Sequence, residues 1–178
     1  LTCNRMTVRG AAIAEVLLLP SETTPEPLGQ RIKAGASSGL TDLLATLVAV
    51  CTMDESYLER DRKTGLTAFK GNPTECALLQ LVQDMGFAYQ DIRDATTGRS
   101  LATLAQGKPF MFSSARKMMS WAVPTPSGGW RIFCKGASEI ILSRCAQMVD
   151  GEGQLRPLGP EGKAAVTKRC PMPHAPPP

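Results

Sequence analysis

The sequence predicts a mixed α/β (α+β) domain in which helices flank an antiparallel sheet. Two kinds of pattern lead to this prediction. Apolar residues recur with a helical period before residue 86, and two runs of alternating residues between 118 and 134 are separated by a turn-forming segment. A chain of 178 residues can bury roughly 70% of the surface of its unfolded form, so we expect a sizeable core.

The first 51 residues are expected to form a strand, a loop and a helix. Residues 6–19 are strand-like, whereas residues 20–39 collect Pro, Ser, Thr and Gly without apolar periodicity, which is typical of a surface loop. Residues 40–51 show the spacing of a helix with one buried stripe. The apolar positions of this helix are Leu40, Leu43, Leu44, Leu47, Val48 and Cys51.

A second helix is predicted after a charged segment, residues 54–63, and a short strand over residues 66–69. Asn72 is a suitable N-cap, Pro73 suits the first helical position, and Glu75 stands where a capping-box carboxylate belongs. The apolar stripe is Leu78, Leu81, Val82 and Met85, and Gly86 ends the helix.

The second half of the chain begins with a polar stretch, residues 91–100, and then changes its period. Residues 118–123 and 130–134 alternate like strands, and the Pro/Ser/Gly segment 124–129 joins them as a hairpin. Gly136 breaks the second strand and opens a helix. A small hairpin over residues 147–158 and a short helix over residues 160–169 follow.

Composition excludes several classes of protein. Hydrophobic residues make up 43% of the chain and charged residues 20%, which argues against wholesale disorder. The net charge of +4, with both signs interspersed, is too small to predict a nucleic-acid-binding face. The longest apolar run, residues 11–19, is interrupted by Glu15 and too short to span a bilayer.

The cysteines and the chain ends give further expectations. Six cysteines without a Cys-x-x-Cys pair favour reduced thiols in the cytosol. Residues 1–6 lack both an initiator Met and a secretory pattern, so we expect the sequence to be a piece of a longer protein. Five prolines lie in residues 171–178, a tail that we expect outside the core.

Common catalytic motifs are absent. The sequence contains neither G-x-x-x-x-G-K-[ST] nor G-x-G-x-x-G, which argues against a Walker-type or Rossmann nucleotide site. The single histidine, His174, lies in the Pro-rich tail, so no zinc set and no Ser-His or Cys-His pair is expected.

Three blocks remain, residues 70–79, 111–120 and 133–139. They place a carboxylate, an aromatic ring and several cations on strands and helix starts. A purine can stack on an aromatic ring and donate from its amino group to a carboxylate, and phosphates bind lysine or helix N-terminal amides. The set of residues therefore fits ATP. A purely structural alternative exists for each member: a capping-box Glu75, a core Phe112, solvated Arg116, Lys117 and Lys135, and a turn glycine at Gly136.

In this order the blocks resemble the nucleotide-binding domain of P-type cation-transporting ATPases. Residues 1–8, L-T-C-N-R-M-T-V, look like the continuation of that family's D-K-T-G-T-L-T phosphorylation motif. G-N-P-T-E-C-A-L-L from Gly71, F-S-S-A-R-K-M-M-S from Phe112, and Ser138 in K-G-A-S-E, where other pumps usually have Pro, are similar to the plasma-membrane calcium type. The resemblance covers about residues 1–170.

The resemblance implies a role for each binding residue. Phe112 would stack on adenine, Glu75 would meet its amino edge, Lys135 and Gly136 would line the pocket floor, and Lys117 would lie near the phosphates.

One position departs from the reticulum pumps, which carry an arginine two residues after the stacking Phe. This chain has Ser114 there, and we expect Arg116 to compensate.

By this resemblance the chain is an ATP-binding domain of a P-type calcium-transporting ATPase. It would deliver ATP, with Mg²⁺, to an aspartate five positions before Leu1 and would contain no catalytic or metal-binding residue itself. Its partners would be the phosphorylation and actuator domains of a pump that exports calcium, and it would lie on the cytosolic side of the plasma membrane or of a calcium-store membrane.

The expected division is a phosphorylation-domain segment and hinge at 1–10, the nucleotide-binding domain at 11–170 and an unassigned tail at 171–178. Alternatives are the same domain of another P-type cation pump, or a non-catalytic binding module with a Pro-rich tail.

Overall fold

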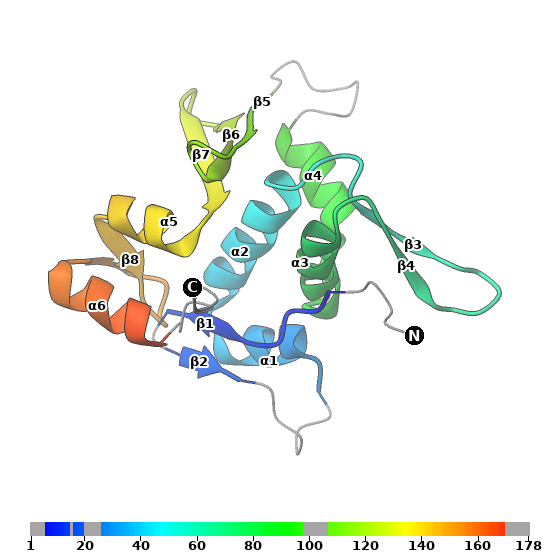
Figure 1. Cartoon of the computed structure of the whole chain (residues 1–178), viewed down its shortest axis with the longest axis horizontal. Helices are drawn as coiled ribbons and strands as arrows, with labels where there is room; N and C mark the ends of the chain where they lie inside the picture. The colour runs from blue at the N-terminus through cyan, green and yellow to red at the C-terminus, as the bar shows by residue number, and fades with distance from the viewer. Residues whose placement is uncertain (1–5, 15, 20–25, 98–106, 170–178) are drawn as a thin grey trace, which may run out of the picture.

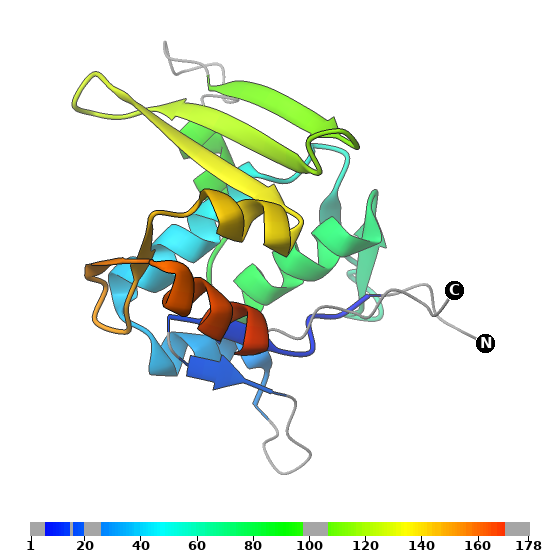
Figure 2. The ribbon, with the colours of Figure 1, turned by 60° about the vertical axis from the view of Figure 1, so that its left-hand side comes forward.

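A computed structural model describes residues 6–14, 16–19, 26–97 and 107–169 of the chain. Four helices form a body, and a three-stranded sheet lies across one end of it (Figure 1). A turned view shows two further helices running along the side of this body below the sheet (Figure 2). The body consists of α1 (Leu28–Gly35), α2 (Ser38–Val50), α3 (Pro73–Asp84) and α4 (Tyr89–Thr97), and the further helices are α5 (Ser138–Arg144) and α6 (Pro160–Arg169).

The described strands all pair antiparallel, which confirms the α/β (α+β) prediction. They are divided over four small sheets. Three are two-stranded: β1 (Ala11–Ile13) with β2 (Val16–Leu18), β3 (Tyr57–Arg60) with β4 (Thr67–Lys70), and β8 (Gln147–Val149) with β9 (Leu155–Pro157). The largest contains β5 (Lys108–Ser113), β6 (Met118–Pro124) and β7 (Trp130–Gly136), in that order.

Two of the three apolar clusters in the described part of the chain hold α2, α3 and α4 together and fasten the sheet to them. The larger joins α2, α3, α4 and β3, and the hydroxyl of its buried Tyr89 accepts a hydrogen bond from the backbone N of Leu58 at 2.9 Å. The smaller packs the end of α2 against the inner face of β6 and β7. Its buried members are Val50, Cys51, Trp121, Val123 and Phe133.

The predicted helices and hairpins over residues 40–51, 72–86, 118–134, 147–158 and 160–169 are confirmed. The helix expected after Gly136 is also present as α5. Two details differ. In α2, Leu43 of the predicted buried stripe is 36% exposed, whereas Ala45 and Ala49 are buried. In β6, every residue from 118 to 123 is buried instead of every second one, because β6 is the central strand of its sheet.

The loop predicted over residues 20–39 is wrong for its second half, which contains α1. A single apolar turn, Leu28 and Ile32, is too short to stand out as a periodic pattern. Ile32 is nevertheless only 1% exposed because it packs against Leu81 of α3 and Met85, the C-cap of that helix. Residues 20–25 lie outside the described part of the chain.

Three other segments also differ from the prediction. The single strand expected over 6–19 is the β1–β2 hairpin, and the charged segment 54–63 contains β3. The polar stretch 91–100 belongs to α4 as far as Thr97, and residues 98–100 lie outside the description. Helix α4 escaped prediction because two of the residues on its buried face, Arg93 and Thr97, are polar.

Among the described residues, Cys51, Cys76, Cys134 and Cys145 are free thiols. No helix in the described ranges is both long and apolar enough to cross a bilayer.

Two glycines with nearly the same backbone angle test how tightly the turn before α3 is packed. Gly71 has φ +83° and a Cβ there would collide with the carbonyl oxygen of Glu55, whereas Gly128 has φ +84° and nothing within 4 Å. Gly128→Ala should cost about 1 kcal/mol of unfolding free energy, and Gly71→Ala about 3 kcal/mol or more, because only the latter adds a backbone clash. Urea unfolding measures both, and equal losses would contradict the tight turn.

Candidate functional site

A pocket of about 560 Å³ lies between the sheet and the helical body. Its lining comes from three parts of the chain: the α2–β3 loop, the start of α3 and the three-stranded sheet. The lining residues are Met53, Glu55 and Ser56 from the loop, Asn72, Thr74 and Glu75 from α3, and Met111, Phe112, Met119 and Lys135 from the sheet.

The start of α3 delivers Glu75 to the pocket. The Asn72 side chain accepts hydrogen bonds from the backbone N of Thr74 at 2.9 Å and of Glu75 at 3.3 Å, which confirms Asn72 as N-cap. The Asn72 backbone N donates to Ser56 Oγ at 3.2 Å instead of to Glu75. The capping-box alternative for the Glu75 carboxylate is therefore wrong.

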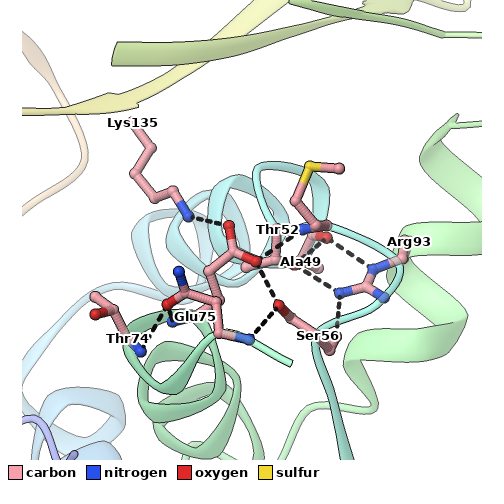
Figure 3. Close-up of polar contacts among 9 residues, drawn as sticks. Ala49, Thr52, Ser56, Thr74, Glu75, Arg93 and Lys135 are labelled. Carbon is pink, nitrogen blue, oxygen red and sulfur yellow. Dashed lines mark hydrogen bonds and ion pairs between the residues drawn. The ribbon is translucent and has the colours of Figure 1, made fainter. Parts of the chain in front are cut away.

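The Glu75 carboxylate is bound from two sides (Figure 3). Its Oε2 accepts from Ser56 Oγ at 2.6 Å and from the Met53 backbone N at 3.0 Å, and its Oε1 accepts from Lys135 Nζ at 2.9 Å. Burial by itself would raise the pKa of Glu75, but the hydroxyl, the ammonium group and the amide outweigh it and hold the pKa below the usual 4.5. Glu75 is thus a buried, ionised carboxylate, able only to accept hydrogen bonds at neutral pH.

Lys135 reaches this carboxylate from β7, where it lies opposite Met119 of β6. Its side chain is only 24% exposed. The alternative of a solvated charge at a strand edge is therefore wrong for Lys135. The ion pair links the sheet to α3 at the wall of the pocket.

Phe112 is 61% exposed, which excludes the alternative that it fills the core. It lies on β5 within a register shift between Phe110 and Ser113. Together with Met111 and Met119 it gives the pocket an apolar wall on the sheet side.

The other predicted site residues gather at the β5–β6 turn and do not line the pocket. Arg116 is exposed and its guanidinium donates to the Met111 carbonyl. Lys117 has φ +50°, and its carbonyl accepts from the Ala137 N at 2.9 Å. A Cβ at Gly136 would lie 2.5 Å from that same carbonyl oxygen, so Gly136 permits the end of β7 to approach the turn.

The sequence-based prediction missed two residues that hold Glu75, Met53 and Ser56. They contribute a backbone amide and a hydroxyl across 22 and 19 positions of the chain. No periodicity or motif marks such contacts, and the capping-box spacing of Asn72 and Glu75 points instead to a partner within α3.

No three His, Cys, Asp or Glu side chains in the described ranges lie close enough together to hold a metal ion.

The sequence profile described as "P-type ATPase, cytoplasmic domain N" matches residues 40–170. The chain belongs to this family. All ten lining residues of the pocket lie within the matched range, so the pocket is a feature of the domain N fold in this chain.

This domain N chain is similar to plasma membrane calcium-transporting ATPases. It is 34% identical over 175 residues to Plasma membrane calcium-transporting ATPase 1 of Homo sapiens, 33% over 177 residues to that of Gallus gallus, and 31% over 180 residues to Plasma membrane calcium-transporting ATPase 3 of Rattus norvegicus. Each alignment covers 98% of the chain but spans only 13% of the length of the relative.

The ionised state of Glu75 predicts how acid affects this domain N. A carboxyl whose pKa is lowered by folding stabilises the fold above its unfolded pKa and loses that contribution as the pH falls. The difference in unfolding free energy between wild type and Glu75→Gln should therefore be constant above about pH 5.5 and shrink below about pH 4.5.

Chemical unfolding of both proteins from pH 7 to pH 3 measures this difference. The pKa values of Asp61 and Asp150 are also lowered, but both residues are present in both proteins and cancel. If the unfolding free energies of the two proteins differ by the same amount at every pH from 7 to 3, the ionised carboxylate of Glu75 is not stabilised as described.

Proposed function

We propose that this domain N binds ATP in the pocket between the sheet and the start of α3. The observation that supports the proposal is the lining itself: an exposed aromatic ring, a buried ionised carboxylate and a lysine meet on one pocket of about 560 Å³. Pockets of this size hold a small molecule with one or two polar anchors.

Each group has a chemical partner in ATP. Adenine would stack on Phe112, and its amino group would donate to the Glu75 carboxylate, which can only accept. Lys135 would lie at the floor of the pocket, whereas Gly136, the next residue, does not line it. The triphosphate would extend toward the exposed β5–β6 turn, where Arg116 and Lys117 supply positive charge.

In a full-length pump, the domain would bring ATP to an aspartate that receives the γ-phosphoryl group, and calcium export would follow. Family membership supports a P-type pump, and similarity to proteins named plasma membrane calcium-transporting ATPases favours calcium over another cation. Mg²⁺ would arrive bound to ATP. The partners would be the phosphorylation and actuator domains, on the cytosolic side of the plasma membrane or of a calcium-store membrane. We also propose that residues 1–10 are the phosphorylation-domain segment and hinge, residues 11–170 the nucleotide-binding domain, and residues 171–178 an unassigned tail.

ATP should bind the isolated chain with a Kd of about 0.1 to 1 mM, because one stacked base and few phosphate contacts supply only modest free energy. Titration with ATP, followed by backbone amide shifts, measures this value. The largest shifts are expected at Ser56, Glu75 and Phe112. Sub-micromolar binding, or none at 10 mM, would contradict the proposed site.

Phe112→Ala should raise the Kd for ATP about tenfold because it removes the stacking ring. Ser114→Ala, a change at an exposed position two residues further along the chain, is the matched control and should alter the Kd less than twofold. Equal effects of the two substitutions would remove Phe112 from the site.

A further inference from the structure

A buried arginine lies behind the pocket wall without lining the pocket. Arg93 of α4 is 6% exposed. Its Nε donates to the Ala49 carbonyl at 3.1 Å, and its Nη2 donates to Thr52 Oγ1 at 2.6 Å and, over a longer 3.4 Å, to the Ser56 carbonyl. All three acceptors belong to the end of α2 and the loop that follows it (Figure 3).

These contacts form a strong attachment for the loop. Hydrogen bonds from a guanidinium are charge-assisted, and the Ala49 carbonyl lies in the last turn of α2, where carbonyls lack helical partners and favour a cation. The Tyr89 ring lies 5.4 Å from the guanidinium, and Asp54 Oδ1 lies 3.9 Å from its Nη1. The charge is therefore compensated on several sides.

The loop that Arg93 holds is the one that holds Glu75. Met53 and Ser56 provide the two donors to Glu75 Oε2, and the Ser56 N in turn donates to the Met53 carbonyl at 3.0 Å. Residues 52–56 therefore lie between a buried cation on α4 and a buried anion on α3.

We propose that Arg93 is a positioning residue of the pocket: it fixes the 52–56 loop so that Met53 and Ser56 orient the Glu75 carboxylate. For its effect on ATP this inference rests on the proposed function, but its effect on Glu75 does not. A residue that only stabilised the core would change the unfolding free energy without changing the hydrogen bonds of Glu75.

Arg93→Lys tests this role in the full 178-residue chain, because lysine keeps the charge but cannot make the three fixed N–H contacts. We expect the pKa of Glu75, followed by the NMR shift of its side-chain carboxyl carbon, to rise toward the usual value. We expect the Kd for ATP to weaken about three- to tenfold. Thr52→Val removes one acceptor of Arg93 without changing any charge, so it should also raise the pKa of Glu75 and the Kd for ATP. This variant remains usable if Arg93→Lys does not fold.

Val82→Ala is the control. It opens a cavity in the core cluster away from the pocket and should lower stability while leaving the Glu75 titration and the Kd unchanged. In a Ser56→Ala background, Arg93→Lys should weaken ATP binding less than it does in the wild-type chain. The reason is that one of the two hydrogen bonds from the loop to Glu75 is already missing in this background.

The inference is overturned if folded Arg93→Lys or Thr52→Val leaves the Glu75 titration unchanged, if Val82→Ala changes it equally, or if the effects of Ser56→Ala and Arg93→Lys simply add. If the wild-type chain binds no ATP, the proposed function fails, and the Glu75 titration alone decides the role of Arg93.

Discussion

The structure around the pocket depends on keeping one buried charge, the carboxylate of Glu75, fully hydrogen-bonded. Removing an ion from water costs several kcal/mol unless partners replace the water. Here the partners come from segments far apart in sequence: Ser56 and Met53 from the α2–β3 loop, and Lys135 from β7, 60 positions further along the chain. Because the partners come from two separate segments, the loop and β7, the requirement of one carboxylate fixes the loop, the start of α3 and the end of β7 relative to one another.

Apolar packing places the sheet so that this ion pair can form. Cys51, at the end of α2, is fully buried with Val50 against Trp121 and Phe133 of the sheet. Burial raises the pKa of its thiol to about 12, an effect that the nearby Lys135 charge opposes without cancelling it. Cys51 therefore stays protonated and behaves as a small apolar side chain. The sheet is thus attached to the helical body by a dry contact, which does not line the pocket, and by the ion pair of Lys135 with Glu75, which does.

The sequence predicted the elements whose signals are local and missed those whose stability comes from distant partners. The N-cap Asn72, the following helix and the hairpin around residues 124–129 depend on neighbouring residues, and all three are present. Helix α1 is stabilised by the packing of Ile32 against α3, a contact between segments far apart in the sequence. Helix α4 buries Arg93, a residue type that is usually exposed. The site divides in the same way. The resemblance to a family pointed to Glu75, Phe112 and Lys135, which do line one pocket, whereas the supporting loop left no pattern in the sequence because its contacts cross about 20 positions.

The hydrogen bonds of Glu75 are distributed unequally over its two carboxylate oxygens. A carboxylate has about four acceptor positions. Oε2 uses both of its positions for Ser56 and Met53, and Oε1 uses one for Lys135. A donor from a ligand can therefore approach Oε1 while the contacts of the loop remain in place. Oε2 is thus occupied by the loop while Oε1 keeps one acceptor position, so the ligand contact that we propose for Glu75 would leave the loop in place.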